Sequence, residues 1–454
     1  MLQHFTARNC RAAVAFTVCI VSRFGFGFGY EPPSSLDFAA NWHQWRGPNS
    51  NGSAPESAAP PVNWNATTNI QWTTDLPGEG SATPVVWGNQ VFVLSAQKTD
   101  RKVETPTVPH NTAKTIPPNT YYQFNVTSID RETGQVQWQK VATEQVPHEG
   151  HHDSHTYAAG SPTTDGERLY ASFGSRGIYC YTLSGELIWQ KDLGDMRTRF
   201  AWGEAVTPAL AGDALVINWD QEVDSFVVAL NKVTGEELWR KSRAEEKTSW
   251  NTPLVTEVNG RTLAILNGSG KVRAYDVANG DVVWECGGQT INAIPSAVRF
   301  DESVICMSGY RGAAAFSIPV DSKGDVTGSD RIRWSHPSGT PYVPSPTLSG
   351  KRLVFTGGNT DILTCLDAAT GKPLLDRRRI PGVGGFYASP LAANGHFYFV
   401  GREGTTAVLK DNETLDVVAT NQLDGIFDAS PVAIGKQLFL RSWNKLYCIS
   451  ESQL

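Results

Sequence analysis

Short runs of alternating apolar and polar residues cover most of the chain, and the runs end at turns that contain glycine. The pattern is clearest in residues 207–239 and 252–284. Both segments begin with Thr-Pro, alternate apolar and polar residues, turn at a glycine and end in tryptophan. Alternation with a period of two indicates β-strands that bury one face. The chain is therefore expected to consist of short strands joined by tight turns.

The same unit recurs eight times, and a proline marks the start of each copy. These prolines are Pro84, Pro162, Pro208, Pro253, Pro295, Pro346, Pro390 and Pro431. After the first interval they lie 41 to 51 residues apart, which is the repeat length of a propeller blade. The predicted fold is therefore all-β, an eight-bladed β-propeller with four antiparallel strands per blade.

Two further positions recur within the unit. The third strand holds a small residue at Ser128, Cys180, Ala229, Ala274, Ala315, Cys365, Val408 and Cys448. The fourth strand ends in tryptophan at Trp138, Trp189, Trp239, Trp284 and Trp334, with Leu375 and Val418 in units six and seven. A strand packed between blades has room for a small side chain only, so Cys180, Cys365 and Cys448 are expected to be buried and unpaired.

The eighth unit ends before a fourth strand, and the N-terminal part of the chain offers one. The segment Asn69–Leu76 reads "NIQWTTDL", with Trp72 in the tryptophan position. We expect this strand to complete the last blade and close the ring, which also covers an otherwise exposed sheet edge.

Three units carry a recognisable repeat ending, in "IDRETGQVQW" (Ile129–Trp138), "LNKVTGEELW" (Leu230–Trp239) and "LDAATGKPLL" (Leu366–Leu375). They resemble PQQ-like propeller repeats, which occur in quinoprotein alcohol dehydrogenases and in BamB, the propeller subunit of the outer-membrane assembly machinery. The opening "WRGPNSNG" (Trp45–Gly52) is similar to the start of exported PQQ-repeat proteins that are abundant in planctomycete-type bacteria. The resemblance covers residues 42–450. It implies the propeller fold and leaves the function open, because this fold hosts many activities.

The first residues are typical of an export signal. Two arginines precede the apolar run Ala12–Val21, which is too short to span a bilayer, and small residues precede Tyr30. We expect a signal peptide at residues 1–29, an N-terminal extension at 30–68 and the propeller at 69–454. The expected location is periplasmic or extracellular, without a transmembrane segment. A leader on a cytoplasmic protein is the alternative.

Charge and cysteine content exclude several classes of protein. The net charge is -6 and 19% of the residues are charged, with no basic run or stripe, so no nucleic-acid partner is expected. Five cysteines follow the predicted signal peptide, an odd number without a C-x-x-C pair. This argues against a complete disulfide framework and against covalently attached haem.

The stretch "PHEGHHDSHTY" (Pro147–Tyr157) contains the pattern H-E-x-x-H of zinc proteases. It lies between two blades and has a glycine in its middle, so the long helix that such a protease needs is not expected. The histidines could still share one face if the loop makes two helical turns, and they would then bind a divalent metal such as Zn²⁺. These candidate metal ligands are His148, His151, His152 and His155. The alternative is a polar loop whose histidines form hydrogen bonds to neighbouring blades or to solvent.

One face of the propeller is expected to carry the functional loops. The loops after units one and two and the insertion Lys98–Thr120 are longer than their counterparts, and all three open on the same face. The candidate ligand-binding residues there are three glycine-flanked arginines with aromatic and acidic neighbours: Arg176, Arg311, Arg402, Trp202, Glu204, Trp219 and Asp220. Guanidinium groups suit carboxylates and phosphates, which predicts a pocket for an anionic ligand. Solvated turn residues are the alternative.

The favoured function is an exported, non-catalytic binding or scaffold module whose partner is a protein, a glycan or a small anionic ligand. No catalytic residue is assigned. A quinoprotein-type oxidoreductase is the first alternative. The resemblance implies a vicinal Cys-Cys pair and a Ca²⁺ ligand set beside the quinone, and neither can be matched in this sequence, so PQQ is not expected as a cofactor. A metal-dependent hydrolase that uses the His148–His155 loop is the second alternative.

Overall fold

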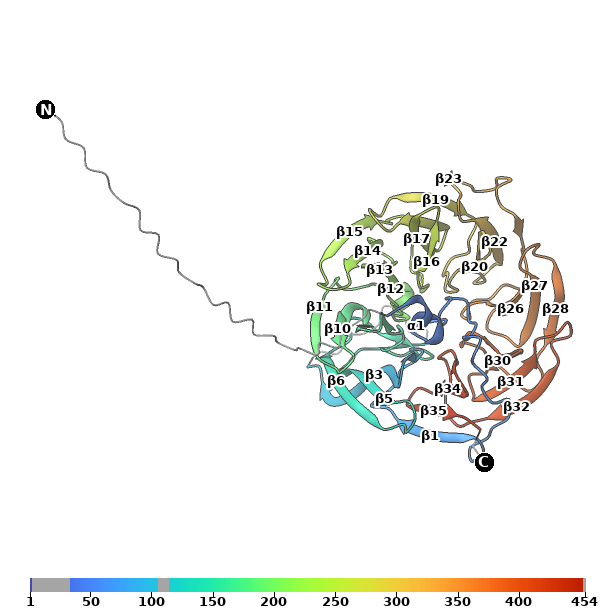
Figure 1. Ribbon diagram of the computed structural model, residues 1–454, viewed down its shortest axis with the longest axis horizontal. Helices are drawn as coiled ribbons and strands as arrows, with labels where there is room; N and C mark the ends of the chain where they lie inside the picture. Colours follow the sequence, from blue (N-terminus) through green and yellow to red (C-terminus); the bar gives the residue numbers. More distant parts are fainter. Residues whose placement is uncertain (2–32, 105–113, 452–454) are drawn as a thin grey trace. The chain divides into compact units, whose positions relative to one another are not determined.

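Eight antiparallel sheets of four strands stand around a central channel and form a β-propeller (Figure 1). The computed structural model describes residues 33–104 and 114–451, together with Met1. The predicted fold class is confirmed, because each sheet holds four consecutive strands of one repeat, with β1 supplying the last strand of the eighth blade.

The strands of blades one to four, from the channel outwards, are β2 (Val85–Trp87), β3 (Gln90–Lys102), β5 (Thr120–Asp130) and β6 (Val136–Gln145); β8 (Thr163–Thr164), β9 (Arg168–Ser172), β10 (Ile178–Thr182) and β11 (Leu187–Lys191); β12 (Ala209–Ala211), β13 (Ala214–Trp219), β14 (Phe226–Asn231) and β15 (Glu237–Ser242); β16 (Leu254–Val258), β17 (Arg261–Asn267), β18 (Lys271–Asp276) and β19 (Val282–Gly287). Those of blades five to eight are β20 (Val298–Phe300), β21 (Ser303–Ser308), β22 (Ala314–Pro319) and β24 (Trp334–Ser335); β25 (Thr347–Ser349), β26 (Arg352–Thr356), β27 (Ile362–Asp367) and β28 (Pro373–Arg379); β29 (Leu391–Ala393), β30 (His396–Val400), β31 (Thr405–Lys410) and β32 (Val417–Gln422); β33 (Val432–Ile434), β34 (Gln437–Arg441), β35 (Lys445–Ile449) and β1 (Ile70–Asp75). A short strand, β23 (Gly324–Asp325), adds to β19 in parallel.

The N-terminal strand β1 closes the ring, as predicted. It pairs antiparallel with β35 and places Trp72 opposite Cys448. The buried Arg441 guanidinium provides a second link, because it donates to the backbone oxygens of Ala82 and Leu94 in the first blade. The last and first blades are thus held together by residues from both ends of the chain.

Tryptophans join the outer strands of successive blades. In each case the indole Nε1 donates to a backbone oxygen in the next blade at 2.7–3.1 Å; the pairs are Trp72 with Arg131, Trp138 with Leu183, Trp189 with Lys232, Trp239 with Val277, Trp284 with Val320 and Trp334 with Ala368. The indole of Trp72 also lies against Gly134, where an added Cβ would come within 2.6 Å of the ring. A side chain at Gly134 would therefore push the indole out of its site.

Blades six and seven lack this tryptophan, and the blade that follows each of them lacks the glycine turn on which the indole would pack. Leu375 replaces it in blade six and packs against the same cluster as Leu415, which occupies the glycine position of the next turn with a φ of 47°. In blade seven, Ala419 rather than the predicted Val418 lies opposite Val408. The following blade has no turn at this place, because its fourth strand is β1. The register of unit five also differs from the prediction, since Ser317 rather than Ala315 lies opposite Trp334.

The cysteine prediction is confirmed, because Cys180, Cys365 and Cys448 are buried and unpaired, as are the other two cysteines in the described residues. Within the same residues, no helix has the length and apolar character needed to cross a membrane. Apart from Met1, the predicted signal peptide lies outside the described part of the chain.

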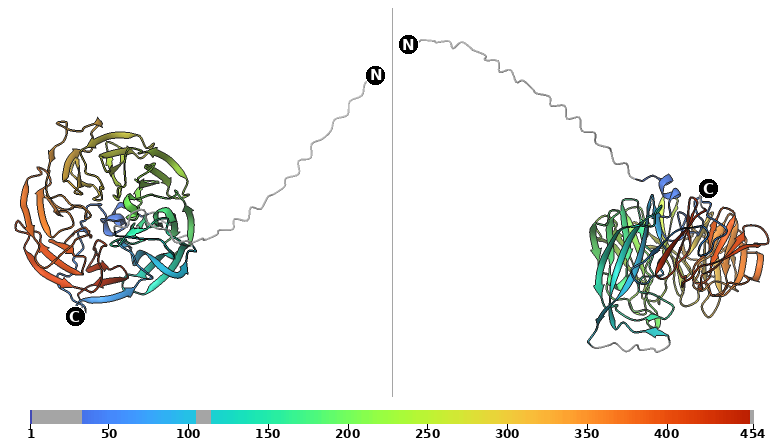
Figure 2. Two further views of the ribbon diagram at one scale, coloured as in Figure 1. Left: turned by 180° about the vertical axis from the view of Figure 1, so that it is seen from behind. Right: turned by 90° about the horizontal axis from the view of Figure 1, so that it is seen from below.

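The two faces of the ring carry different segments. Helix α1 (Ser35–Ala40) stands over one face and overlies the centre of the ring in the axial view (Figure 1). Two short strands, β4 (Thr115–Ile116) and β7 (His151–His152), pair with each other at the opposite face (Figure 2). We call this second face the loop face, because the fourth-to-first and second-to-third connections open on it.

We expect Trp72→Ala to cost about 3–5 kcal/mol of unfolding free energy, the usual range for truncating a buried aromatic side chain. The substitution removes both the packing on Gly134 and the Nε1 hydrogen bond that closes the ring. Urea unfolding followed by circular dichroism measures the change. The exposed outer-strand variant Val418→Ala is the control and should stay within about 0.5 kcal/mol of the parent. A loss below about 1 kcal/mol for Trp72→Ala would contradict the closure mechanism.

Candidate functional site

The three long connections of the first blades meet on the loop face, as predicted. Strand β4, from the insertion in blade one, pairs with β7 in the loop after that blade. The Thr115 hydroxyl donates to the backbone oxygen of Phe200, and the His152 amide donates to that of Trp202, so the loop after blade two joins them. Residues 105–113 of the insertion lie outside the described part of the chain.

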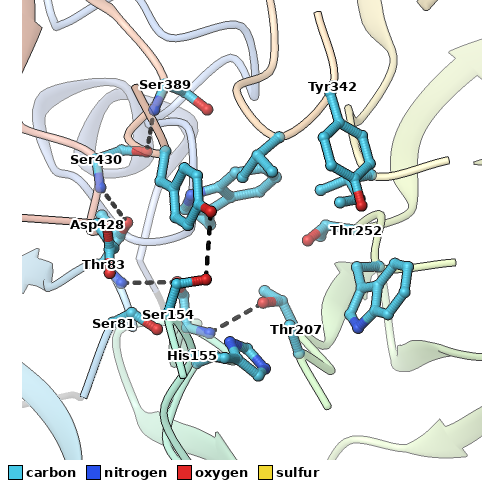
Figure 3. Close-up of a pocket in the computed structure, with 18 of the residues that line it drawn as sticks. Ser81, Thr83, Ser154, His155, Thr207, Thr252, Tyr342, Ser389, Asp428 and Ser430 are labelled. Carbon is cyan, nitrogen blue, oxygen red and sulfur yellow. Dashed lines mark hydrogen bonds between the residues drawn. The ribbon is translucent and has the colours of Figure 1, made fainter. Parts of the chain in front are cut away.

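A ring of hydroxyl groups surrounds the channel at the start of the innermost strands. In seven cases the backbone N–H of one ring residue donates to the side-chain hydroxyl of the ring residue in the next blade, at 2.8–3.1 Å. The donor and acceptor pairs are Thr83 to Ser161, Ser161 to Thr207, Thr252 to Ser296, Ser296 to Ser345, Ser345 to Ser389, Ser389 to Ser430 and Ser430 to Thr83. Several of these bonds are drawn in Figure 3. The place of Ser296 shows that Ala297, rather than the predicted Pro295, is equivalent to the first-strand proline of the other blades.

A cavity of about 320 Å³ occupies the channel at this ring. Ring hydroxyls from several blades line it, together with His152, Ser154, His155 and Asp428 (Figure 3). Much of the rest of its wall is aromatic and is formed by Trp45, Trp202, Trp250, Tyr310, Tyr342 and Tyr387. A concave, mostly apolar cavity with a few convergent polar groups is the usual form of a small-molecule site.

The predicted helical arrangement of the histidines is wrong, because His151 and His152 form strand β7. Each ring has a different partner: Nδ1 of His148 lies 3.1 Å from Asp195, Nδ1 of His151 contacts a backbone oxygen, Nδ1 of His152 lies 2.7 Å from Ser154 Oγ, and Nε2 of His155 contacts the backbone oxygen of Glu204. Within residues 33–104 and 114–451, no group of three or more His, Cys, Asp or Glu side chains is placed to hold a metal ion. The four-histidine metal site thus loses its geometric basis.

The three predicted arginines do not converge. Arg402 flanks the channel cavity, where its Nε donates to Asp428 at 2.8 Å and its guanidinium lies 4.8 Å from the Tyr387 ring. Arg311 is exposed above the ring of Tyr310, which lines the cavity. Arg176 was predicted to belong to the same pocket, but it pairs with Asp195 at 2.9 Å and lines a separate, smaller cavity.

The predicted aromatic and acidic residues also lie in different places: one lines the channel cavity, one lines the smaller cavity, and two lie in the core of blade three. Trp202 lines the channel cavity and Glu204 the smaller one. Trp219 and Asp220 are buried in blade three, where Asp220 accepts two hydrogen bonds from Arg243 at 2.7 and 2.9 Å. These two residues are therefore part of the protein core and were wrongly predicted to bind a ligand.

Sequence reasoning missed Arg199, which lies in the loop between blades two and three. Its half-buried guanidinium has no ion-pair partner in the described residues, and its Nε is buried without a hydrogen-bond partner there. Arg199 does not itself line the channel cavity, but its charge acts on Tyr342, which does: burial raises the pKa of Tyr342 to about 12, and the charge of Arg199 opposes this rise. The next two residues, Phe200 and Ala201, have φ angles of 56° and 52°. Strained backbone of this kind is enriched at functional sites. The only signal in the sequence is the basic and aromatic stretch "RTRFAW" (Arg197–Trp202).

The smaller cavity, of about 30 Å³, is lined by two partly buried acids, Glu149 and Glu204. Glu149 accepts hydrogen bonds from the amide and hydroxyl of Thr198, and Glu204 accepts them from the amide and hydroxyl of Ser175 at 2.6 Å. Burial raises the pKa of each carboxyl group to about 7, against the opposing effect of these hydrogen bonds. The pair therefore titrates near neutral pH beside the loop that carries Trp202.

Comparisons with known proteins agree with this architecture. The sequence profile of the family described as outer membrane protein assembly factor BamB matches residues 123–374, more than half of the chain. The chain belongs to this family. Among solved structures, BamB from Moraxella catarrhalis is similar with a TM-score of 0.51 and 12% identity, over 78% of this chain and 98% of that one. A europium-containing methanol dehydrogenase is similar with a TM-score of 0.64 and 9% identity, over 91% and 98%. At these identities the likeness shows the fold alone. No curated protein matches the chain.

The dehydrogenase likeness raises the question whether the cavity suits a metal and quinone pair. Its one acidic side chain, Asp428, is already bonded to Arg402 and to the indole of Trp443. The described cysteines lie in five different blades, so no vicinal pair faces the channel. The side chains of this family member therefore do not fit a metal–quinone centre.

We expect the stabilisation provided by the Glu149 and Glu204 pair to be lost between about pH 4.5 and 7.5. An acid whose pKa is raised from about 4.5 to about 7 on folding binds its proton more tightly in the folded state. The resulting stabilisation is largest at low pH and disappears as the pH rises through about 7. Histidines with lowered pKa values act in the opposite sense up to about pH 7, because their unfolded state binds the proton more tightly, and they are unchanged in a Glu149 variant.

Thermal unfolding at the two pH values provides the measurement. Glu149→Gln should reduce the fall in Tm, because the amide keeps an oxygen for both Thr198 donors and cannot ionise. Arg197 and Glu222 act on this group in opposite directions and are unchanged in the variant. An equal fall in Tm for the parent and for Glu149→Gln would show that the pair does not titrate in this range.

Proposed function

We propose that the protein is an exported binding module, and that its channel cavity binds a small organic anion with a flat apolar body. The family and the propeller fold support a binding or scaffold role. The size of the cavity supports a small-molecule ligand, because about 320 Å³ lies within the range of such sites. Three features of the cavity support this ligand chemistry.

The aromatic wall favours a flat apolar body. Tyr310 and Tyr342 pack against each other with ring centroids 4.8 Å apart, and Trp202 lies edge-on to Tyr310 at 6.3 Å. Rings held in this way present rigid surfaces, so a flat ligand can bury apolar area at little cost in side-chain entropy.

The ring hydroxyls favour a ligand with hydrogen-bond acceptors. Those of Thr83, Ser161, Thr207, Ser389 and Ser430 each accept one backbone N–H, and in the described residues none of them donates to an acceptor. Their O–H protons are therefore left to donate to a bound molecule.

The unpaired charge of Arg199 is the observation that carries the proposal. Arg402, at the other side of the cavity, already has Asp428 as its counter-ion, whereas no carboxylate in the described residues pairs with Arg199. A half-buried cation without an anion lacks the interaction that would compensate its desolvation. A ligand carboxylate, sulfonate or phosphate would provide that interaction through two parallel hydrogen bonds.

A protein partner is the second candidate, because large apolar side chains are exposed on the loop face. Ile116, Phe200, Ile291 and Ile426 are 40–44% exposed, and all lie in connections that open on this face. An anionic group on a protein could then occupy the cavity while these side chains pack at the rim.

The anion hypothesis is tested with two probes that share an apolar body. 8-Anilinonaphthalene-1-sulfonate carries a negative charge, and N-phenyl-1-naphthylamine is its neutral analogue. We expect the parent protein to bind the sulfonate more tightly. Arg199→Gln should weaken sulfonate binding about tenfold, because a hydrogen bond to a charged group contributes about 1.5–3 kcal/mol, and should leave binding of the neutral probe unchanged.

Fluorescence titration gives both dissociation constants. Arg176→Gln is the matched control, because this arginine is on the loop face but pairs with Asp195 outside the channel cavity. Equal affinities of the parent for both probes, or an equal loss in the two arginine variants, would refute the anion hypothesis.

A further inference from the structure

The N-terminal extension crosses the channel on the face opposite the loop face. Trp42 exchanges two backbone hydrogen bonds with Val86 in blade one, and the backbone oxygen of His43 accepts from Thr164 in blade two. On the other side of the ring, the oxygen of Asn51 accepts from Leu348 in blade six, and that of Gly52 accepts from Ala392 in blade seven. Eleven residues, Trp42–Gly52, thus connect innermost strands that lie across the channel from each other.

Arg46 fixes the middle of this segment inside the channel. Its guanidinium is buried and donates to the backbone oxygens of Pro390 at 3.1 Å and of Pro346, and to the Thr347 hydroxyl at 2.9 Å. Pro346 and Pro390 directly follow the ring residues Ser345 and Ser389. The side chain is therefore anchored to the innermost strands of blades six and seven, immediately next to the hydroxyl ring.

The glycines of "WRGPNSNG" allow this close approach. Gly47 has a φ of 79°, and an added Cβ would lie 3.0 Å from the Trp42 ring and 3.1 Å from a backbone oxygen. Gly52 has a φ of 81°, and an added Cβ would lie 2.5 Å from the Arg46 guanidinium. Side chains at either position would force the segment away from the channel.

Trp45 precedes the anchor, and its indole forms part of the cavity wall. We propose that Trp42–Gly52 is a fixed plug that closes one end of the channel and supplies Trp45 as the floor of the cavity, so that a ligand enters from the loop face only. Arg46 is the positioning residue of this plug and does not itself line the cavity. The role of Trp45 in ligand contact rests on the proposed function, whereas the closure of the channel does not.

Contact with the floor is tested by binding of 8-anilinonaphthalene-1-sulfonate to the full chain. Trp45→Ala should weaken binding at least fivefold, because the deepest aromatic surface is lost. Trp64→Ala is the matched control, since this buried tryptophan belongs to the same extension but stacks on Tyr398 outside the cavity. Its dissociation constant should stay within twofold of the parent. Equal affinities of Trp45→Ala and the parent would overturn the role of Trp45.

Closure of the channel is tested without a ligand, by hydrogen–deuterium exchange of peptides that contain Leu348 and Ala392. Arg46→Met should speed their exchange at least tenfold, because their amides bond to the plug. Arg441→Met is the control: this guanidinium is equally buried without a counter-ion and bonds to blade one. It should leave those peptides near the parent rate, even where it lowers Tm by as much as Arg46→Met.

The two tests separate the hypotheses. Unchanged exchange in Arg46→Met would overturn the plug, whatever the probe does. If the parent binds neither naphthalene probe, the proposed ligand chemistry fails and Trp45 loses its role as a ligand-binding floor. Exchange then decides whether the segment closes the channel.

Discussion

The hydrogen bonds between a backbone N–H of one blade and a Ser or Thr hydroxyl of the next are the interaction on which the rest of the structure depends. They join seven successive pairs of innermost strands around the channel. Outer strands are joined by the tryptophans, which need a glycine or an open turn in the neighbouring blade. A closed ring tolerates no free edge, so β1 must return from the N-terminus to complete the last blade.

This inner ring also positions the candidate site. Its hydroxyls form one level of the channel, Trp42–Gly52 fills the channel on one side, and the long connections of the first blades surround the opening on the other. The ring hydroxyls belong to the β-sheet scaffold, whereas Arg199 belongs to a loop, where the strained residues Phe200 and Ala201 follow it. A rigid ring with variable loops explains how one fold can present different ligand chemistry without changes in its blades.

The sequence predicted most of the fold because the repeats carry their own landmarks. The closing role of Trp72 and the shared face of the long connections followed from the spacing of those landmarks. Errors arose where a unit changes length locally: Pro295, Ala315 and Val418 were each assigned one or two residues away from the equivalent position. The candidate site was harder to predict, because loop conformation decides which side chains meet. His151 and His152 form a strand, Asp220 pairs with a buried arginine, and the unpaired state of Arg199 depends on residues far away in the sequence.

A crystal structure of the full chain soaked with 8-anilinonaphthalene-1-sulfonate tests the central claim most directly. The account predicts density for the probe in the channel, with its rings against the aromatic wall and its sulfonate within hydrogen-bonding distance of Arg199. Density on the exposed apolar residues of the outer strands, with an empty channel at a saturating concentration of the probe, would contradict it.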